Sequence, residues 1–443
     1  MTGVQTCALP IFCQLELLRH CFPPSVRDVL EELPESLDET YERILKEIRK
    51  PNQGHAHRLL QCLVVAARPL RVEELAEVLA FDFNTRGMPK LNPGWRWEDQ
   101  EEAVMSACSS LVTIVKYGYS RVVQFSHFSV KEFLTADRLA EPIRDVTCYH
   151  IRLEAAHTIL AQACVGVLLR LDDHVDRESI KNFPLALYAA RYWPTHARVE
   201  NVSSCIKDGM ECLFDVEKRH FSTWLWIYDD DTNYLPKSMF TVRPEKPEAV
   251  PLYYAAKLGF RDLAEHLIAK HPEDVNARGG YEVTPIHAAA SAVHANILSL
   301  LTEHGADVNG RGKSFESPLH VASENARLEA GKFLLDSGAD INAGGDGKFT
   351  PLSRAASLGH VEFARMLLER GAVIDAPDRD GQTALHWAAR MGKTQAVRLL
   401  LEHGADANAR DKSGDTPSQL GSHWGHHEIV ELLSEYGVES VKQ

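Results

Sequence analysis

Thr284-Pro285-Ile286-His287 is the first of five related tetrapeptides that recur at one constant spacing in the C-terminal half. The second residue of each is at position 285, 318, 351, 384 or 417, and an earlier copy, Val250-Pro251-Leu252-Tyr253, precedes the first at nearly the same spacing. The tetrapeptides and two further series of residues share this spacing. Together the three series predict six copies of one structural unit over residues 249–443. The other two series are Gly305, Gly338, Gly371, Gly404 and Gly437, and Asn276, Asn309, Asn342, Asp375 and Asn408.

The residues at these positions are those that begin and end helices. Thr or Ser before Pro is a helix N-cap followed by a first-turn proline, whose missing N–H is not needed at that place. A Leu-Leu run before Gly-Ala ends the second helix, and Asp or Asn with Gly builds the turn to the next copy. We therefore expect Gly371 and Gly404 at positive φ, and we expect the polar last copy, with Ser418 and Gln419, to cap the array.

The three series resemble ankyrin repeats, and the resemblance covers residues 249–443. It implies a C-terminal solenoid that binds partner proteins through variable surface positions. The histidines that end three of the tetrapeptides are expected to be polar pins of the turns. Three others near the C-terminus are expected to be solvated and not a metal site, since no Cys or carboxylate stands at ligand spacing. The first set is His287, His320 and His386, and the second is His423, His426 and His427.

Three aromatic residues, Tyr281, Phe315 and Phe349, recur at a constant spacing in the loops between repeats. Loops of this kind normally carry Gly, Asp and Asn, as the later pairs Asp380-Gly381 and Ser413-Gly414 do. Aromatic side chains on exposed edges are enriched at protein interfaces. The sequence therefore predicts that these three residues form a protein-binding row. In the alternative, each ring folds back over its own hairpin and covers the neighbouring repeat.

Residues 36–140 carry the pattern of a winged-helix domain. Ser36-Leu37-Asp38-Glu39 is a capping box, and it opens a helix with its apolar residues on one face. Two β-rich runs, 111–115 and 122–125, flank a Tyr-Gly-Tyr-Ser segment and predict a hairpin. Three helices are expected before the hairpin and one after it. They cover residues 36–48, 59–64, 72–79 and 130–134.

Three segments resemble fungal NACHT-type signalling NTPases: Leu33-Pro34-Glu35-Ser36-Leu37-Asp38-Glu39-Thr40-Tyr41-Glu42-Arg43-Ile44-Leu45, Phe125-Ser126-His127-Phe128-Ser129-Val130-Lys131-Glu132-Phe133-Leu134 and Phe183-Pro184-Leu185-Ala186-Leu187-Tyr188-Ala189-Ala190-Arg191-Tyr192-Trp193. In these proteins a nucleotide-binding module is followed by a winged helix, also described for GPI inositol-deacylase-related proteins, by a helical region and often by ankyrin repeats. The resemblance implies that residues 12–35 are the end of such a module and that residues 141–248 are a helical linker region. Residues 1–11 resemble the translation of a sequencing-library adapter, so we expect them to be a scar.

The same resemblance singles out His127, which lies between the predicted hairpin and the closing helix. In the wider family of signalling ATPases, a histidine in this place contacts the ADP phosphate and holds the closed state. An imidazole suits this role because it donates a hydrogen bond to a phosphate and titrates near neutrality. The alternative is a histidine that caps or packs at the start of a helix. The nucleotide contact requires the upstream domain.

No motif for nucleotide binding or acyl transfer is found in the sequence. It contains no Gly-x-x-x-x-Gly-Lys-Ser/Thr loop and no Gly-x-Ser-x-Gly nucleophile elbow. Gly312-Lys313-Ser314 and Gly392-Lys393-Thr394 lack the upstream glycine and the preceding strand of a phosphate-binding loop. We therefore expect no enzymatic activity and no bound cofactor.

The composition argues against nucleic acids and membranes as partners. The chain has 48 Lys and Arg against 62 Asp and Glu, a net charge of −14, and the excess of acid is shared equally between residues 1–248 and 249–443. Neither half carries the basic surface that binding to phosphates requires. The longest mainly apolar stretch, 155–169, is too short to span a bilayer. The 9 cysteines form no Cys-x-x-Cys pair, which favours a reducing, cytoplasmic location.

Together these features predict a mainly α protein with a winged-helix domain, a helical linker domain and a C-terminal ankyrin-repeat solenoid. The predicted function is that of the non-catalytic protein-interaction and regulatory (sensor) half of a NACHT–ankyrin signalling protein, with an upstream NACHT domain and partner proteins bound by the array. The alternative is a stand-alone ankyrin adaptor without any NTPase domain. A winged-helix DNA-binding protein is disfavoured by the charge.

Overall fold

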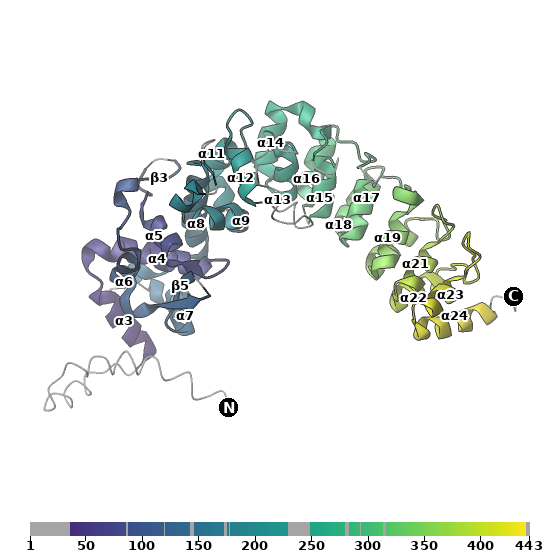
Figure 1. Ribbon diagram of the computed structural model, residues 1–443, viewed down its shortest axis with the longest axis horizontal. Helices are drawn as coiled ribbons and strands as arrows, with labels where there is room; N and C mark the ends of the chain where they lie inside the picture. The colour runs from purple at the N-terminus through teal and green to yellow at the C-terminus, as the bar shows by residue number, and fades with distance from the viewer. Residues whose placement is uncertain are drawn as a thin grey trace. The chain divides into compact units, whose positions relative to one another are not determined.

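The computed structural model describes residues 36–85, 87–118, 120–141, 146–171, 175–176, 178–228, 249–279, 283–292, 294–312 and 316–439. The chain divides into two compact units, Met1–Glu245 and Lys246–Gln443. Helices dominate both units, which confirms the mainly α prediction (Figure 1). The adapter-like segment 1–11 and the segment 12–35 lie outside the described residues.

The described part of the first unit begins with a winged-helix domain. Its three-stranded antiparallel sheet has the order β1-β5-β4, and the predicted hairpin pairs Val112 with Phe125 and Tyr117 with Ser120. The first helix begins where the sequence predicts, because the Ser36 hydroxyl accepts the Glu39 N–H at 3.2 Å. The elements are α3 Leu37–Glu47, α4 Gln53–Val65, β1 Leu70–Arg71, α5 Val72–Leu79, α6 Gln100–Cys108, β4 Val112–Tyr117, β5 Ser120–Phe125 and α7 Phe128–Thr135.

Three parts of this domain are absent from the sequence prediction. Two of these parts are strand β1 and a two-stranded sheet, which consists of β2 (Phe81–Asp82) and β3 (Lys90–Leu91). All three strands are too short to show a periodic pattern in the sequence. Helix α6 has a start signal that the prediction overlooked. The carboxylate of Asp99 accepts the N–H groups of Glu101 and Glu102, both at 3.0 Å.

A helical region completes the first unit. The apolar stretch near residue 160 forms a helix that packs on the next helix and on α4 of the winged-helix domain. Aromatic side chains fill the space between the later helices, where Trp193, Phe214 and Trp224 are fully buried. The helices are α8 Leu153–Leu168, α9 Ala186–Ala197, α10 Val202–Cys205, α11 Lys207–Leu213 and α12 His220–Tyr228.

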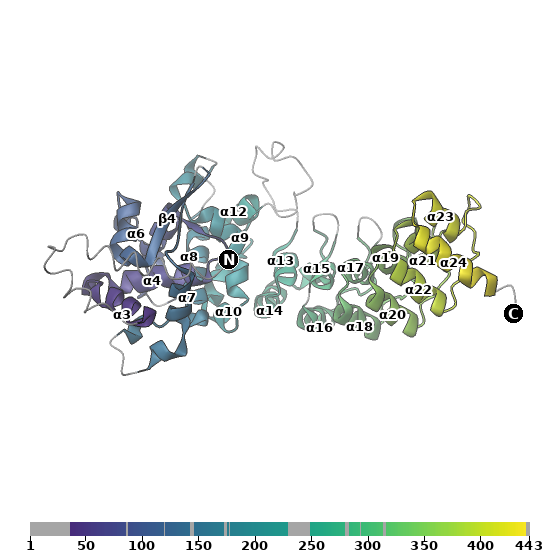
Figure 2. The ribbon, with the colours of Figure 1, turned by 90° about the horizontal axis from the view of Figure 1, so that it is seen from below.

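The second unit consists of helix pairs at the predicted period. Its first helices form one row and its second helices form another (Figure 2). Each helix of a row packs on the next helix of the same row. The pairs are α13 Pro251–Leu258 and α14 Arg261–Lys270, α15 Pro285–Ser291 and α16 Ala295–Glu303, α17 Pro318–Glu324 and α18 Leu328–Asp336, α19 Pro351–Leu358 and α20 Val361–Glu369, α21 Ala384–Arg390 and α22 Thr394–Glu402, and α23 Pro417–His423 and α24 His427–Glu439.

Short 3₁₀ helices connect the longer elements. They are η2 Lys50–Asn52, η3 Pro93–Trp95, η4 Ser109–Leu111, η5 Asp137–Ala140, η6 Thr147–Tyr149, η7 Ser179–Asn182, η8 Pro272–Asn276 and η10 Asp346–Lys348. Pro93 and Pro272 each stand in the first turn of their helix, where the missing N–H is not needed.

The glycine series has the predicted backbone conformation in four of its five copies. Gly371 has φ +88° and Gly404 has φ +87°, and each ends the second helix of its pair. Gly437 differs because α24, the last helix, continues through it to Glu439. No further repeat within the described residues requires the chain to turn at that point.

Changing Gly404 to Ala is expected to lower the free energy of unfolding by about 1 kcal/mol. A Cβ at Gly404 would have no heavy atom within 4 Å, so the cost comes from the left-handed backbone alone. Gly54 is a suitable control, since it is also uncrowded but has no positive φ and lies in helix α4. Urea unfolding should show a loss for Gly404→Ala and none for Gly54→Ala. Equal effects would contradict the assigned register.

Candidate protein-interaction site

Buried histidines fix the start of the first helix in three repeats. The Nδ1 atom of His287 accepts the Thr284 N–H at 3.3 Å, and its Nε2 atom donates to the Glu316 carbonyl of the next repeat at 3.1 Å. The ring therefore caps its own helix and ties two repeats together. The predicted role as a polar pin is correct for all three. The same contacts are made by His320 with Ser317 and Phe349, and by His386 with Thr383 and Asp415.

The Asn and Asp series also ties neighbouring repeats together. The Asn276 side chain donates to the Gly305 carbonyl at 2.9 Å and accepts the Asp307 N–H at 2.8 Å. The sequence predicted these residues as builders of turns, and the structure adds that Asn276 reaches forward to the next repeat. The array is therefore held by local caps and by hydrogen bonds between repeats. The side chains that likewise accept a backbone N–H of the next repeat are Asn309, Asn342 and Asp375.

Of the three aromatic residues predicted as a protein-binding row, only Phe349 is among the described residues, and Tyr281 and Phe315 lie outside them. The half-buried Phe349 ring lies 4.9 Å from the Trp387 ring of the next repeat, edge to face. The Arg354 guanidinium lies 4.9 Å from the centre of the same ring. These are the contacts that the packing alternative predicts for Phe349. The binding role of the row stays a prediction.

A cluster of aromatic and arginine side chains extends from Phe349 across the last three repeats. The Arg390 guanidinium, at the end of α21, lies 5.1 Å from the Trp387 ring centre and 5.5 Å from that of Trp424 in the next repeat. Trp424 is 54% exposed, and Met391, which follows Arg390 in the chain, is 46% exposed. Tryptophan and arginine are the residues that most often dominate the energy of protein interfaces. We call Phe349, Arg354, Trp387, Arg390, Met391 and Trp424 the aromatic–arginine cluster.

The sequence prediction missed this cluster, although one signal was present. Leu358, Met391 and Trp424 recur at the period of the repeats, and all three are exposed. Each stands at or just beyond the end of a first helix, where the repeat pattern needs no apolar residue. The cation–π contacts themselves depend on how repeats stack, which a single sequence does not give.

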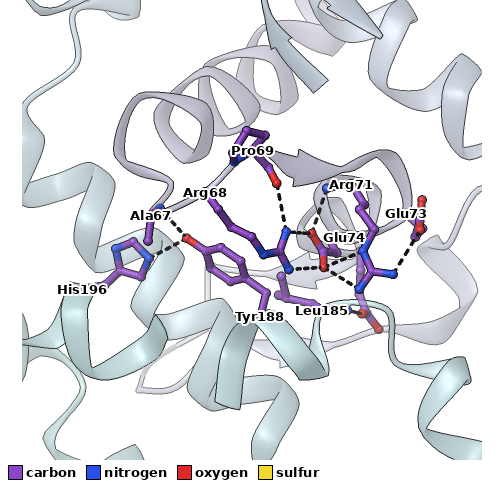
Figure 3. Close-up of polar contacts among 10 residues, drawn as sticks. Ala67, Arg68, Pro69, Arg71, Glu73, Glu74, Leu185, Tyr188 and His196 are labelled. Atoms are coloured by element: carbon purple, nitrogen blue, oxygen red, sulfur yellow. Dashed lines mark hydrogen bonds and ion pairs between the residues drawn. The ribbon is translucent and has the colours of Figure 1, made fainter. Parts of the chain in front are cut away.

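In the winged-helix domain, a buried carboxylate binds two arginines (Figure 3). The Glu74 side chain is fully buried and accepts two hydrogen bonds from Arg68, at 2.6 and 2.8 Å. It also accepts the Arg71 backbone N–H at 2.8 Å and the Arg71 Nε–H at 3.0 Å. Burial alone would raise the pKa of Glu74, but the hydrogen bonds from both arginines and their charges hold it below its ordinary value. Glu74 is therefore ionised at neutral pH.

Further polar contacts join the winged-helix domain to the helical region within the first unit (Figure 3). The Tyr188 hydroxyl of α9 accepts the Ala67 N–H at 3.0 Å and lies 2.9 Å from Nε2 of His196. Burial, together with the nearby His157, lowers the pKa of His196 to about 4. The Glu77 carboxylate of α5 accepts the Leu185 N–H at 2.7 Å. Sequence reasoning missed the contacts between the two regions, because their partners lie far apart along the chain.

His127 is the N-cap of helix α7. Its Nδ1 atom accepts the Ser129 N–H at 3.3 Å and lies 2.5 Å from the Ser129 hydroxyl, which in turn is 2.8 Å from the Tyr41 hydroxyl. These are the contacts that the capping alternative predicts. A contact between His127 and the ADP phosphate of an upstream domain stays a prediction.

The comparison with known families decides what the repeats are. Residues 252–345 and 352–443 each match a family described as ankyrin repeats in three copies. The array is made of ankyrin repeats. Residues 41–143 match the winged helix domain of GPI inositol-deacylase. A winged helix is not a hydrolase domain, so this second match assigns no catalytic residue to the chain.

Two curated proteins are similar to parts of this chain. Azaphilone pigments biosynthesis cluster protein L of Monascus ruber is 32% identical over 288 residues, which cover 61% of this chain and 60% of that protein. Alpha-latrocrustotoxin-Lt1a of Latrodectus tredecimguttatus is 41% identical over 51 residues, 12% of this chain and 4% of the toxin. The chain thus spans about 60% of the length of the first relative and about 4% of the length of the second. The region matched to the Monascus ruber protein covers 61% of this chain, which is more than the second unit, Lys246–Gln443, contains. The similarity therefore extends into the first unit.

The three C-terminal histidines were predicted to be solvated, and His426 differs because it is half-buried. His426, one of the three C-terminal histidines, donates through Nε2 to the Arg390 carbonyl at 3.2 Å. Within the described ranges, no group of three or more His, Cys, Asp or Glu side chains is placed to hold a metal ion. Over the same residues, no helix is both long enough and apolar enough to cross a bilayer. Gly392 and Lys393 connect two helices of a repeat, not a strand and a helix.

The free energy of unfolding of the ankyrin array is expected to fall as the pH is lowered from about 7.5 to about 5.5. Burial lowers the pKa of His287, His320 and His386 below the ordinary value, against the opposing effect of their carbonyl partners. Around these pKa values the unfolded chain therefore binds more protons than the folded chain. The stability that the neutral histidines contribute is complete above about pH 6.5 and is lost as the pH falls below that value. Each such histidine contributes up to about 1.4 kcal/mol per pH unit.

Urea unfolding of wild type and His386→Gln at both pH values checks this prediction. A glutamine keeps the cap, since Gln419 accepts the Thr416 N–H at 2.8 Å in the last repeat, but it does not titrate. The variant should therefore lose less stability than wild type on acidification. The same loss in both proteins would contradict the role given to His386.

Proposed function

We propose that this chain is a non-catalytic protein-interaction and regulatory module that binds partner proteins through its ankyrin array. The observation that carries the proposal is the aromatic–arginine cluster, which exposes Trp424 and Met391 on an array of a type known for protein binding. Ankyrin repeats stack into a continuous surface, and side chains there are free to vary because the caps and the hydrogen bonds between repeats maintain the fold.

We further propose that the module is the sensor half of a NACHT–ankyrin signalling protein located in the cytoplasm. Support comes from the order of the parts, a winged helix of the GPI inositol-deacylase type followed by helices and ankyrin repeats. The contacts of Tyr188 with Ala67 and of Glu77 with Leu185 link the winged helix to the helical region. Such a link suits a module that transmits a binding event toward an upstream domain.

A second candidate is a stand-alone ankyrin adaptor. The name of the Monascus ruber relative favours it, since that name refers to a biosynthesis cluster and not to an NTPase. Sequencing of the native transcript upstream of Phe12 separates the two candidates. An in-frame phosphate-binding loop supports the NACHT–ankyrin protein, and a start codon near Phe12 supports the adaptor.

Cross-linking tests the interaction function itself. The tagged full-length chain is incubated with a fungal extract, cross-linked through lysine side chains and analysed by mass spectrometry. Both units offer exposed lysines, for example Lys270 and Lys412 in the array and Lys50 and Lys181 in the first unit. Captured proteins should cross-link to the array. Cross-links confined to the first unit would contradict the proposal.

A further inference from the structure

We infer that the aromatic–arginine cluster binds an acidic segment of a partner protein, in which a carboxylate side chain stands next to an apolar side chain. This inference rests on the proposed function and names the chemistry of the partner. The Arg390 guanidinium would bind the carboxylate, and Trp424 and Met391 would contact the apolar side chain.

The position of Arg390 prepares it for a carboxylate. Its guanidinium lies close to the rings of both Trp387 and Trp424, at 5.1 and 5.5 Å from the two ring centres. Stacking on aromatic rings leaves the N–H groups at the edge of the planar guanidinium available for hydrogen bonds. A guanidinium held in this way loses little conformational freedom when a carboxylate binds to it with two parallel hydrogen bonds.

The two arginines of the cluster differ in their partners. Arg354 already forms an ion pair with Glu316 at 2.5 Å. For Arg390, no ion pair is found within the described part of the chain, where its guanidinium contacts the two tryptophan rings. Arg390 is therefore the cation of the cluster that is available to a carboxylate from another molecule.

The charge around Arg390 also favours an acidic partner. Helices α19, α21 and α23, which carry most of the cluster, contain no Asp or Glu, although the chain as a whole has a net charge of −14. Helices α13 and α15, the first helices of two earlier repeats, also lack Asp and Glu, whereas α17 ends in Glu324. The carboxylate of Asp378, which contacts the cluster, already accepts the Trp387 indole N–H at 2.9 Å and forms no ion pair with Arg390 among the described residues. The Arg390 guanidinium is therefore complementary to a carboxylate of a partner segment and repels a basic one.

The apolar part of the partner is argued from the exposed side chains beside Arg390. Trp424 and Met391 are each about half exposed, and Leu358, at the equivalent position of the preceding repeat, is 38% exposed. A flexible methionine adapts to different apolar side chains, and a tryptophan supplies a large contact area. A polyanion such as a nucleic acid fits this surface less well, because it requires cations for successive phosphates, and of the two cluster arginines only Arg390 has no ion pair among the described residues.

Fluorescence anisotropy with the full-length chain tests the inference. The probe is the labelled peptide Gly-Ser-Asp-Leu-Glu-Phe-Asp-Leu-Gly-Ser, and the comparison peptide has lysine in place of each acidic residue. The acidic peptide should bind at least about tenfold more tightly than the basic one. Arg390→Ala should weaken its binding by about tenfold or more, and Arg390→Lys should also weaken it, since lysine lacks the planar, two-pronged group. Arg398→Ala, at an exposed position of α22, should have no effect.

Circular dichroism confirms that each variant is folded before binding is measured. Equal binding of the two peptides, an unchanged affinity in Arg390→Ala, or stronger binding of a single-stranded oligonucleotide than of the acidic peptide would overturn the inference. The proposed function would be contradicted by a different result, namely that captured proteins cross-link to the first unit and not to the array. Cross-links to the array without acidic-peptide binding would reject the acidic partner and retain the interaction function.

Discussion

Replacing Trp224 by Ala is expected to lower the free energy of unfolding of the first unit by about 4 kcal/mol. Trp224 is fully buried, and its indole N–H donates to the Ala190 carbonyl at 3.0 Å. An alanine would leave a large cavity between helices α9 and α12 and a buried carbonyl without its donor. The rings around the indole, with centres 5.4 to 5.9 Å away, are Trp193, Phe214, Phe221 and Tyr228.

Trp226 provides the matched control, because it lies on the same helix and is only partly buried. Trp226→Ala should cost clearly less than Trp224→Ala in urea unfolding. The prediction concerns the first unit, so the transition of the ankyrin array should stay unchanged. A smaller effect for Trp224→Ala than for Trp226→Ala would show that the helical core is assigned incorrectly.

Replacing Glu74 by Ala is expected to lower the free energy of unfolding by about 3 kcal/mol. The carboxylate is the common acceptor of Arg68, of the Arg71 side chain and of the Arg71 backbone N–H. Without it, two guanidinium groups lie close together with no negative charge between them, and a backbone donor loses its acceptor. The partial exposure of both arginines, at 31% and 29%, lets water reduce this cost and keeps it at the lower end of the range for buried pairs.

The neighbouring Glu73 is the control for this change. Its carboxylate lies 3.8 Å from the Arg71 guanidinium and is one-third exposed, so Glu73→Ala should change the free energy of unfolding by less than about 0.5 kcal/mol. Thermal unfolding of both variants, at a pH near 7, separates the two cases. Equal losses would contradict the special role of Glu74.

The ankyrin array was predictable from sequence because each recurring residue acts locally or at a constant distance. Thr383 and His386 cap a helix within its first turn, and Gly404 turns the chain where the period requires it. Helix α6 and strand β1 were missed in the winged-helix domain, where no repeat reinforces a weak local signal. The borders at residues 140 and 248 stay predictions, as does the NACHT domain upstream.

The functional surface was less predictable than the fold. Its central contact joins Arg390 to Trp424 of the following repeat, and their approach follows from how two helix pairs stack. Sequence reasoning instead selected Tyr281, Phe315 and Phe349 from their recurrence in loops. Phe349 does belong to the cluster, through its contacts with Trp387 and Arg354, although these are packing contacts.

The central claim is that partner proteins bind the ankyrin array at the aromatic–arginine cluster. The most direct test compares two full-length variants, Trp387→Ala/Arg390→Ala/Trp424→Ala and the control Arg398→Ala, by quantitative mass spectrometry of the proteins they retain from a fungal extract. Both variants must show the helical circular dichroism of wild type. The account predicts that the control retains the wild-type partners and that the triple variant loses them. Retention of the same partners by the folded triple variant would contradict the account.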